Sequence, residues 1–561
     1  MRLLDWCVLV GFLVFVVAYG VWKGRKNRDL DEYILANRGM RWHTVALSIM
    51  ATQASAITFL STPGQAYTDG MRFIQFYLGL PIAMVILSIT AVPIYHRLKV
   101  YTAYEYLERR FDLKTRSLTG GLFLIQRGLA GGLTIYAPSL IFSVIMGWPL
   151  NTVILVIGGL VTLYTATGGT KAVEHTHFQQ ALIITCGMLT AFFTILYLLP
   201  RDVSFVEATY VAGKLGRLNA IDFSFDLQNR YNFWSGLIGG LFVALSYFGT
   251  DQSQVQRYLT GKSVAQSRLG LLFNGMVKVP MQFFILFLGA MVFVFYQFVP
   301  SPVFFNPSET EKLQTGQYAA EFRALETQHS EAEAARQQEV RRVIEAMRAG
   351  DSRAEAEADE SLQAAQQRVG KVRADAVALM QRNDKTANTN DTNYVFLNFV
   401  IHYLPAGVVG LVIAAIFCAS MSSSSAELNS LATTTVIDVY RRLIKRDASE
   451  RHYVLVSKLA TAFWGCFAMT FALNVGNLSS LVETVNRLGS LFYGTILGIF
   501  LLAFYFKRIG GTATFYAAIV GEAAVLLCAS FTPIAFLWYN VVGCLAVIMA
   551  ALVINPLVRR R

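Results

Sequence analysis

The sequence predicts an all-α integral membrane protein with about 13 transmembrane helices. Of its 561 residues 54% are hydrophobic and only 15% are charged, whereas about a quarter of the residues of a soluble protein are charged. Apolar runs of nearly twenty residues recur from one end of the chain to the other, and a helix needs a run of that length to cross a bilayer. The predicted spans are 3–22, 43–66, 72–97, 119–146, 150–168, 176–199, 233–252, 268–298, 396–434, 453–475, 480–506, 511–531 and 533–555.

The loops between these spans concentrate positive charge on one side. If the spans alternate, one set of loops, taken with the C-terminal arginines, holds 26 Lys and Arg, and the other set, leaving out residues 301–392, holds six. Positively charged loops stay in the cytoplasm. We therefore expect a multi-pass protein of the plasma (inner) membrane, with its N-terminus outside and its C-terminus in the cytoplasm. The net charge of +12 is then a sign of topology and not of nucleic-acid binding.

The first apolar run and the cysteines carry no separate chemistry. The run at 3–22 lacks a clear cleavage site, so we expect a retained helix and not a signal peptide. All six cysteines fall in apolar segments, and none forms a CxxC pair. Packing inside the membrane is the interpretation that this pattern favours, without a zinc site or a disulfide framework.

Residues 301–392 interrupt the apolar pattern and divide the membrane domain into 1–300 and 393–561. They contain 16 acidic and 12 basic residues and are rich in Ala, Gln and Glu. With a turn signal near their middle, they predict two polar helices, about 315–348 and 353–382. The alternation of loops places this insert on the extracytoplasmic side. We expect a solvated helical hairpin that packs on itself, with an arm that docks a protein partner as the alternative.

The spans fall into two groups of five. The second to sixth and the seventh to eleventh spans each form one group, and because five is odd, the second group is inverted relative to the first. Such a 5+5 inverted repeat is typical of secondary transporters, which bind their solute and coupling ion where helices break. The second and ninth spans are the two that are rich in polar residues, and the proposed repeat depends on them and on the number of spans.

The second span contains the segment 48–64, SIMATQASAITFLSTPG. An unwound helix at this point would free backbone carbonyls for an ion and side chains for a solute. A helix contact of small residues, with the hydroxyls bonded back to their own helix, explains the composition equally well. The segment by itself leaves both interpretations open.

The ninth span contains four consecutive serines within residues 419–430, ASMSSSSAELNS. A hydroxyl that faces hydrocarbon without a partner is costly, so this cluster predicts a cavity, a helix contact or an ion site. Ala419, Ser422 and Ser423 are spaced i, i+3 and i+4, so they share one helix face and can point at one place. Hydroxyl and carbonyl oxygens are the ligands that a hard cation such as sodium takes.

Four stretches resemble the sodium/solute symporter family, which includes the sodium-coupled sugar, proline, sialic acid, iodide and monocarboxylate carriers. They are 102–111 (TAYEYLERRF), 164–173 (YTATGGTKAV), 246–258 (SYFGTDQSQVQRY) followed by 261–263 (GKS), and the serine segment continued to 437–440 (IDVY). The segment 135–139, IYAPS, leans towards the iodide and monocarboxylate branch. The resemblance covers nearly all of the membrane body, omits the insert, and implies a 5+5 core of the LeuT type.

This resemblance implies a sodium site between the second and ninth spans. The family takes two backbone carbonyls from the broken second span, and these fall on Ala51 and Ala54. The ninth span supplies the carbonyl of Ala419 and the hydroxyls of Ser422 and Ser423. Five neutral oxygens around a monovalent ion give weak, reversible binding, as a carrier requires. Sodium, as the coupling ion, is the one cofactor that the sequence predicts.

A second sodium site, found in some relatives, is incomplete in this chain. Ser425 is available for it, but the next position is Ala426, and the position of the family's aspartate is His177. These departures argue for a single sodium ion. Glu174 and His177 are the candidates for a titratable group in place of the second cation.

The resemblance also implies a solute site at mid-membrane beside the ion. Thr58, Tyr77 and Ala244 stand where the sugar carriers have an amide, a carboxylate and an amide, which disfavours a neutral hexose. Gln53 stands where the proline carriers have an aspartate, which disfavours proline. The implied solute contacts are Gln53, Ser55, Thr58, Phe73, Tyr77, Tyr247, which resembles the inner aromatic gate of the sugar carriers, and Phe248.

Four basic residues lie inside the spans and outside the loops: Arg127, Lys278, Lys458 and Arg487. An ionisable group inside a span is a functional-site hypothesis by default. Arg487 follows Glu483 by one helical turn, which predicts an ion pair between the two. Arg127 has no acid within two turns. A guanidinium fits a carboxylate bidentately, and an arginine on the matching helix of the sialic acid carriers holds the substrate carboxylate, so an anion clamp and an ion pair with a distant acid are both open for Arg127.

The sequence as a whole predicts a sodium-coupled symporter that imports a small organic solute by alternating access. An anion such as sialic acid or a monocarboxylate is the leading substrate class. A membrane sensor on a transporter scaffold, with 301–392 as its docking arm, is the alternative. No pair of nucleophile and base and no metal triad points to an enzyme. The predicted partners are the solute and membrane lipid, and the insert is the one candidate site for a protein.

Overall fold

The computed structural model of the chain describes residues 2–24, 30–475 and 480–559, apart from the side chains at 17, 20–24, 30, 32, 168–178 and 559. These parts are helical, and they contain no β-strand. The α-helices are α1 Leu3–Gly24, α2 Leu30–Leu35, α3 Trp42–Gln53, α4 Ala56–Asp69, α5 Leu80–Ile89, α6 Ala91–Leu98, α7 Ala103–Arg110, α8 Leu113–Met146, α9 Leu150–Leu198, α10 Phe205–Lys214, α11 Gly240–Gly249, α12 Gln252–Leu259, α13 Val264–Phe298, α14 Pro307–Thr315, α15 Ala319–Ala349, α16 Ser352–Asn383, α17 Thr392–Tyr403, α18 Val408–Thr434, α19 Glu450–Asn474, α20 Leu481–Tyr505, α21 Gly511–Phe531 and α22 Leu537–Arg559.

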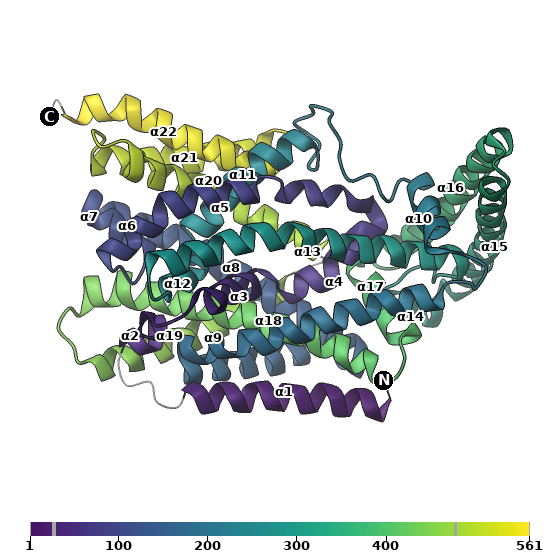
Figure 1. Cartoon of the computed structure of the whole chain (residues 1–561), viewed down its shortest axis with the longest axis horizontal. Helices are drawn as coiled ribbons and strands as arrows, with labels where there is room; N and C mark the ends of the chain where they lie inside the picture. The colour runs from purple at the N-terminus through teal and green to yellow at the C-terminus, as the bar shows by residue number, and fades with distance from the viewer. Residues whose placement is uncertain (1, 25–29, 476–479, 560–561) are drawn as a thin grey trace.

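The long helices run side by side as one bundle (Figure 1). In this view α1 lies along one edge of the bundle, α21 and α22 lie along the opposite edge, and α13 and α18 run between them. The two helices α15 and α16 stand across one end of the bundle. The N-terminus lies at the same end as α15 and α16, and the C-terminus lies at the other end (Figure 1).

Ten helices are long and apolar enough to cross a membrane, and two shorter apolar helices, Leu3–Val16 and Ser235–Gly249, accompany them within the described residues. These two correspond to the predicted spans 3–22 and 233–252. Residues 150–168 and 176–199, predicted as two spans with a loop between them, belong to the one helical element α9.

The predicted span 396–434 is wrong in one respect, because the structure divides it. Helix α17 ends at Tyr403, Leu404 is extended (φ −75°, ψ 147°), and α18 begins at Val408. Pro405 explains the break, since proline has no N–H to donate and pushes the residue before it out of the helical region. The serine segment therefore lies in a separate helix, α18, which is buried along most of its length.

The two helices predicted for the insert are confirmed, as α15 and α16. Apolar side chains of α15 are buried in this hairpin, with Val340 fully inaccessible and Ile344 3% exposed. The insert also packs on the membrane body, and not only on itself. Three polar contacts that join it to α10 and to the end of α13 are Arg348 Nε–Glu207 Oε1 (2.6 Å), Lys214 Nζ–Glu355 Oε1 (2.9 Å) and Arg336 Nη2–Tyr296 O (2.7 Å).

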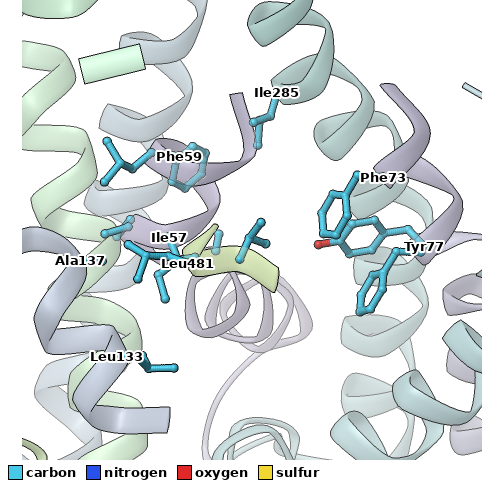
Figure 2. Packing of buried hydrophobic residues seen from close by; sticks show 14 of the residues in the cluster. Ile57, Phe59, Phe73, Tyr77, Leu133, Ala137, Ile285 and Leu481 are labelled. Carbon is cyan, nitrogen blue, oxygen red and sulfur yellow. The ribbon is translucent and has the colours of Figure 1, made fainter. Parts of the chain in front are cut away.

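Small residues let the central helices approach one another closely. A Cβ atom at Gly289 of α13 would lie 2.2 Å from the carbonyl oxygen of Pro63 in α4, so only glycine fits this crossing. Figure 2 shows the apolar packing around α4, where Ile57 and Phe59 lie between Ala137 of α8 and the aromatic residue Tyr77. This packing fixes α4 at the centre of the bundle, beside the polar residues described next.

Candidate functional site

The second predicted span is broken at its centre. Helix α3 ends at Gln53 and α4 begins at Ala56, and the residues between them are not helical: Ala54 has φ −85° and ψ 78°, and Ser55 has φ −83° and ψ 170°. The unwound helix that the polar segment 48–64 suggested is therefore confirmed. A break of this kind frees backbone carbonyls that an intact helix would bond to itself, and it is tolerated in a membrane only where it lines a cavity or lies within protein.

The break opens on a central cavity formed by α3, α4, α8, α11, α18 and α20, together with the 3₁₀ segment Gly70–Tyr77 and Leu80 at the start of α5. Its walls mix aromatic and aliphatic side chains with polar ones, as in most small-molecule sites. The lining residues are Thr52, Gln53, Ser55, Ile57, Thr58, Phe76, Tyr77, Leu80, Gln126, Arg127, Thr134, Gly240, Val243, Ala244, Tyr247, Phe248, Ser423, Glu427, Val482, Val485, Asn486 and Tyr493.

The tertiary structure brings together almost all of the residues predicted to contact the solute. Those that line the cavity are Gln53, Ser55, Thr58, Tyr77, Arg127, Tyr247 and Phe248. Phe73 lies behind this wall instead. It is 1% exposed and packs against Phe76 and Tyr77, with ring centroids 5.5 Å and 5.8 Å away. Phe73 therefore supports two lining aromatic side chains from outside the cavity.

The residues predicted to bind sodium also meet, at the contact between α3 and α18. The Ser422 hydroxyl donates to the carbonyl oxygen of Ala51, 3.2 Å away, which joins the ninth span to the broken second span. The Ser423 hydroxyl donates to the carbonyl oxygen of Ala419, at 2.7 Å, and Ser423 also lines the cavity. Ala54 lies in the break itself. A cluster of neutral oxygens thus adjoins the cavity, and its donor set fits a hard monovalent cation.

The remaining serines of the cluster have other surroundings. The Ser425 hydroxyl donates to the carbonyl oxygen of Ser422, at 3.0 Å, and the Ser420 hydroxyl donates to the carbonyl oxygen of Thr134, at 3.4 Å. The Ser424 hydroxyl is buried and bonds to none of the described residues. The side chains of Glu174 and His177 lie outside the described residues.

Arg127 is held by two acids that are distant in the sequence. Its Nη2 donates to Asp251 Oδ2 and, at 2.8 Å, to the hydroxyl of Tyr493, and its Nη1 donates to Glu427 Oε1 at 3.0 Å. The guanidinium also lies 5.4 Å from the centre of the Tyr247 ring, within range of a cation–π interaction. The ion pair with a distant acid is therefore present, and Arg127 still contributes to the cavity wall.

Tyr247 and Tyr493 form one aromatic side of the cavity. Their ring centroids are 6.0 Å apart. The Tyr247 hydroxyl accepts a hydrogen bond of 2.8 Å from the Gln254 side chain, and the carbonyl oxygen of Tyr493 accepts one of 2.8 Å from the Ser246 hydroxyl. The first bond fixes the Tyr247 side chain, and the second joins α11 to the backbone of α20 at Tyr493.

Two other basic residues in the spans are Arg487, whose predicted ion pair is not formed, and Lys278, which is buried. Glu483 forms its ion pair with Arg230, at 2.5 Å, so the predicted pair of Glu483 with Arg487 is wrong. A loop before α11 places Arg230 over Glu483, which local spacing in the sequence does not reveal. Lys278 on α13 is fully buried, and its amino group, 5.6 Å from the centre of the Tyr77 ring, has no hydrogen-bond acceptor among the described residues.

Sequence reasoning missed several lining residues, above all Glu427 and Tyr493. Glu427 follows the serine cluster directly and is a carboxylate inside an apolar span, so the rule that ionisable groups within spans mark functional sites would have found it. Tyr493 and Asn486 lie on α20 without a distinguishing pattern. No signal in the sequence points to them, because only the fold brings α20 to the cavity.

The chain matches a family model described as the sodium:solute symporter family over residues 33–320 and 371–521. The unmatched stretch between these ranges is most of α15 and the first half of α16. Among individual proteins, the whole chain is 25% identical to the sodium/sialic acid symporter SiaT of Proteus mirabilis, and the match covers 99% of this chain and 95% of that protein. It is 34% identical to the human sodium/iodide cotransporter over 278 residues, which is 48% of this chain and 42% of that protein.

A solved structure shares the fold. A Na+-coupled sialic acid symporter in a substrate-bound outward-open state matches with a TM-score of 0.76 at 23% sequence identity, covering 99% of this chain and 98% of that chain. This match confirms the predicted all-α membrane fold of the LeuT type. Family model, full-length relative and fold agree, and we conclude that the chain belongs to the sodium:solute symporter family and is a sodium-coupled symporter.

Proposed function

We propose that the chain imports a small organic anion together with sodium by alternating access, and that it acts as a carrier and not as an enzyme. One observation carries this proposal. The break at Ala54 and Ser55 joins the serine cluster of α18 to a central cavity, with Ser422 bonded to Ala51 and Ser423 on the cavity wall. An ion and a solute bound there would each stabilise the same packing of α3 against α18. Because both favour this contact, the binding of one would favour the binding of the other.

The sodium ligands in this proposal are the carbonyl oxygens of Ala51, Ala54 and Ala419 and the hydroxyl oxygens of Ser422 and Ser423. The hydrogen bonds already present join four of these groups in two pairs, Ser422 with Ala51 between the helices and Ser423 with Ala419 within α18. Both hydroxyls are buried, at 1% exposed. A hydroxyl that donates a proton to a neighbouring carbonyl still has lone pairs for a cation, so the cluster can take up sodium with little rearrangement.

The solute site is the cavity wall, which contains several polar atoms without a partner. The buried Gln53 Oε1, Thr52 Oγ1, Gln126 Oε1 and Arg127 Nε accept or donate no hydrogen bond within the described part of the chain. Leaving such groups unsatisfied costs about 1–3 kcal/mol each. A polar solute that bonds to them removes this cost. Arg127 provides a donor for a carboxylate, and the similarity to sialic acid and iodide carriers supports an anion.

The predicted topology belongs to the same proposal: a plasma (inner) membrane protein with its N-terminus outside, its C-terminus in the cytoplasm and the 301–392 insert outside. The asymmetry of positive charge between the loops supports it. The N-terminus and the insert lie at one end of the bundle, and the C-terminus lies at the other (Figure 1). We further propose that 301–392 forms a separate polar unit between the two parts of the membrane domain, and that any protein partner binds there.

The experiment is sodium-dependent uptake of labelled sialic acid and labelled pyruvate into proteoliposomes containing the full chain. We expect uptake of at least one of these anions, driven by a sodium gradient. Ser423→Ala should raise the sodium concentration for half-maximal uptake at least tenfold. The matched control is Ser424→Ala, which removes a buried hydroxyl of the same helix that forms no hydrogen bond with Ala51 or Ala419.

Two outcomes would contradict the proposal. Equal sodium dependence in Ser423→Ala and in the unmodified chain would remove Ser423 from the ion site. Binding of sialic acid or pyruvate without any uptake would favour a sensor on a transporter scaffold. In that case, the insert would be the first place to look for its partner.

A further inference from the structure

Three of the four stretches that resemble the family meet in one cluster of hydrogen bonds. They are 102–111, 246–258 and 437–440, and they lie on α7, on α12 with the residues before it, and on the segment Thr435–Ile444 that continues α18. The cluster lies towards the end of the bundle that holds the C-terminus, which the proposed topology places in the cytoplasm (Figure 1). None of the described lining residues of the cavity comes from 102–111 or 437–440, so these stretches act outside the cavity.

The seventh predicted span is broken, as the second is. Helix α11 ends at Gly249 and α12 begins at Gln252, and the two residues between them are not helical: Thr250 has φ −132°, and Asp251 has ψ 120°. The last turn of α11 supplies two aromatic side chains to the cavity wall, one of them Tyr247. Helix α12 is buried along its whole length. It continues the span from the cavity wall towards the cytoplasmic end of the bundle (Figure 1).

The side chain of Gln252 bonds α12 to the backbone at the start of α7. Its Nε2 donates to the carbonyl oxygen of Tyr101 at 2.8 Å, and its Oε1 accepts from the backbone N–H of Ala103 at 3.1 Å. Next to it, the carbonyl oxygen of Thr250 accepts from the Tyr104 hydroxyl at 3.0 Å. Gln252 and Tyr104 are fully buried. Three neutral hydrogen bonds thus tie the broken part of the seventh span to α7.

Ion pairs hold α7 on its other side. The Thr102 hydroxyl and Arg116 Nε both donate to Asp438 Oδ1, at 2.9 Å and 2.7 Å. Glu108 of α7 accepts from Arg116 Nη1 at 2.6 Å and from Arg442 Nε at 2.8 Å. Arg116 and Asp438 are buried, and separating a buried ion pair costs more than breaking a neutral hydrogen bond. The contact of α7 with α12 is therefore weaker than its contact with α8 and the end of α18.

Helix α12 also holds one of the aromatic side chains of the cavity. Gln254 Nε2 donates to the Tyr247 hydroxyl at 2.8 Å, and Gln254 follows Gln252 by two residues on the same short helix. A movement of α12 away from α7 would carry Gln254 with it. Because Tyr247 lines the cavity, such a movement would change the cavity wall on its cytoplasmic side.

We propose that Gln252 is a positioning residue for transport: its two bonds to α7 keep the cytoplasmic side of the cavity closed, and they break when the solute leaves. This inference rests on the alternating access of the proposed function. Helix α12 moves about the break at Thr250 and Asp251, while α7 stays with α8 and α18 through the pair of Arg116 with Asp438. Neutral groups suit a contact that forms and breaks in every cycle, because opening it leaves no buried charge without a partner.

The experiment measures from which side of the membrane the cavity can be reached. Ala244 lines the cavity, and Ala244→Cys places a thiol there. Its labelling by a membrane-impermeant maleimide is followed by mass spectrometry, in inside-out and in right-side-out membrane vesicles from cells that express the full chain. Adding Gln252→Leu, which keeps a similar volume without the hydrogen bonds, should speed labelling from the inside about tenfold. Labelling from the outside should not rise, whereas a loosened fold would speed labelling from both sides.

Two further variants complete the experiment, each combined with Ala244→Cys. Tyr104→Phe removes only the hydroxyl that bonds to Thr250 and should speed labelling from the inside about threefold. Since it keeps the buried ring, it decides the question if Gln252→Leu does not reach the membrane. The matched control is Gln297→Leu on α13. Gln297 is fully buried, and its Nε2 donates to the carbonyl oxygen of Phe293 in its own helix, so labelling should stay unchanged.

The outcomes are separable from those of the proposed function. Labelling from the inside that is equal in Gln252→Leu, Tyr104→Phe and the Gln297→Leu control overturns the inference, and sodium-dependent uptake by the unmodified chain would still support the proposed function. Labelling that rises from both sides also overturns the inference, because the bonds then serve the fold alone. If labelling rises from the inside only, and the unmodified chain takes up neither sialic acid nor pyruvate, the inference stands and the proposed solute class fails.

Discussion

The Ser422 hydroxyl lies 3.2 Å from the carbonyl oxygen of Ala51, across the contact between α18 and α3. The two residues are 371 positions apart in the sequence. Small residues at this contact let the helices approach, and the break after Gln53 leaves the end of α3 free to accept bonds from outside its own helix. The same pair supplies two of the five proposed sodium ligands, so helix packing and ion binding depend on one contact.

Replacing Ser422 with alanine should weaken sodium binding, because it removes one ligand and the bond to Ala51. Sodium at a hundred times its Kd stabilises the folded protein by about 2.7 kcal/mol, and a tenfold weaker Kd lowers this to about 1.4 kcal/mol. Thermal melting of the purified protein with and without sodium measures the difference. Ser424→Ala is the control and should keep the full sodium-induced shift in Tm. An unchanged shift in Ser422→Ala would exclude its hydroxyl from the site.

Asp251→Asn should destabilise the protein strongly. Asparagine still caps a helix, so the cap of α12 survives, but Arg127 Nη2 loses its charged partner and keeps only the Tyr493 hydroxyl. Removing one member of a buried ion pair costs about 3–5 kcal/mol. Thermal melting in detergent should show a clearly lower Tm than for Asp226→Asn, whose carboxylate lies on an exposed loop and bonds to the backbone N–H of Gln228 at 2.8 Å. Equal Tm values for the two variants would contradict the central role given to the Asp251–Arg127 pair.

Lys278→Met should raise the Tm of the protein. The amino group of Lys278 is fully buried and bonds to no acceptor in the described parts of the chain, while methionine has a similar volume and no charge. Removing an unsatisfied buried polar group recovers about 1–3 kcal/mol. The matched control is Lys458→Met on α19, where the side chain is exposed and the Tm should stay the same. A lower Tm for Lys278→Met would show that the amine has a partner, such as a bound anion behind Tyr77.

The insert should loosen as the solution becomes mildly acidic. His329 on α15 is 4% exposed, and its burial lowers the pKa of the imidazole from 6.5 to about 4, with Arg373 as the next cause. The unfolded insert binds a proton below pH 6.5 and the folded insert does not until about pH 4. The contribution of neutral, buried His329 to the free energy of unfolding is therefore complete above pH 6.5. It is lost as the pH falls towards 4, by up to about 3 kcal/mol.

Hydrogen–deuterium exchange of α15 and α16 at a series of pH values checks this expectation. The comparison is with His329→Gln at the same pH, which cancels the intrinsic pH dependence of exchange and the contribution of Glu333, 3.6 Å from the His329 ring. Protection in the unmodified chain should fall relative to the variant between pH 6.5 and 5. A constant difference across this range would show that His329 does not titrate with unfolding of the insert.

Much of the site could be predicted because its parts are local. The small and hydroxyl-bearing residues around Ala54 make a break in the second span one of two local interpretations, and the face of Ser422 and Ser423 follows from helical spacing. The long-range ion pairs could not be predicted in this way. Glu483 has Arg487 one turn away and yet pairs with Arg230, because a loop that folds over the bundle offers a closer cation than the helix does.

The sequence alone determined the class of the molecule: apolar runs of membrane length, the polar insert with its two helices and the serine face. These follow from the cost of exposing polar backbone to lipid and from helical periodicity, which act within a few turns of chain. Only the tertiary structure decided what those parts do together. It placed Asp251 and Glu427 on either side of Arg127, and it brought Ser422 to Ala51. The reason is physical: the charge balance of a cavity is a sum over residues from several helices, and packing sets which residues enter that sum.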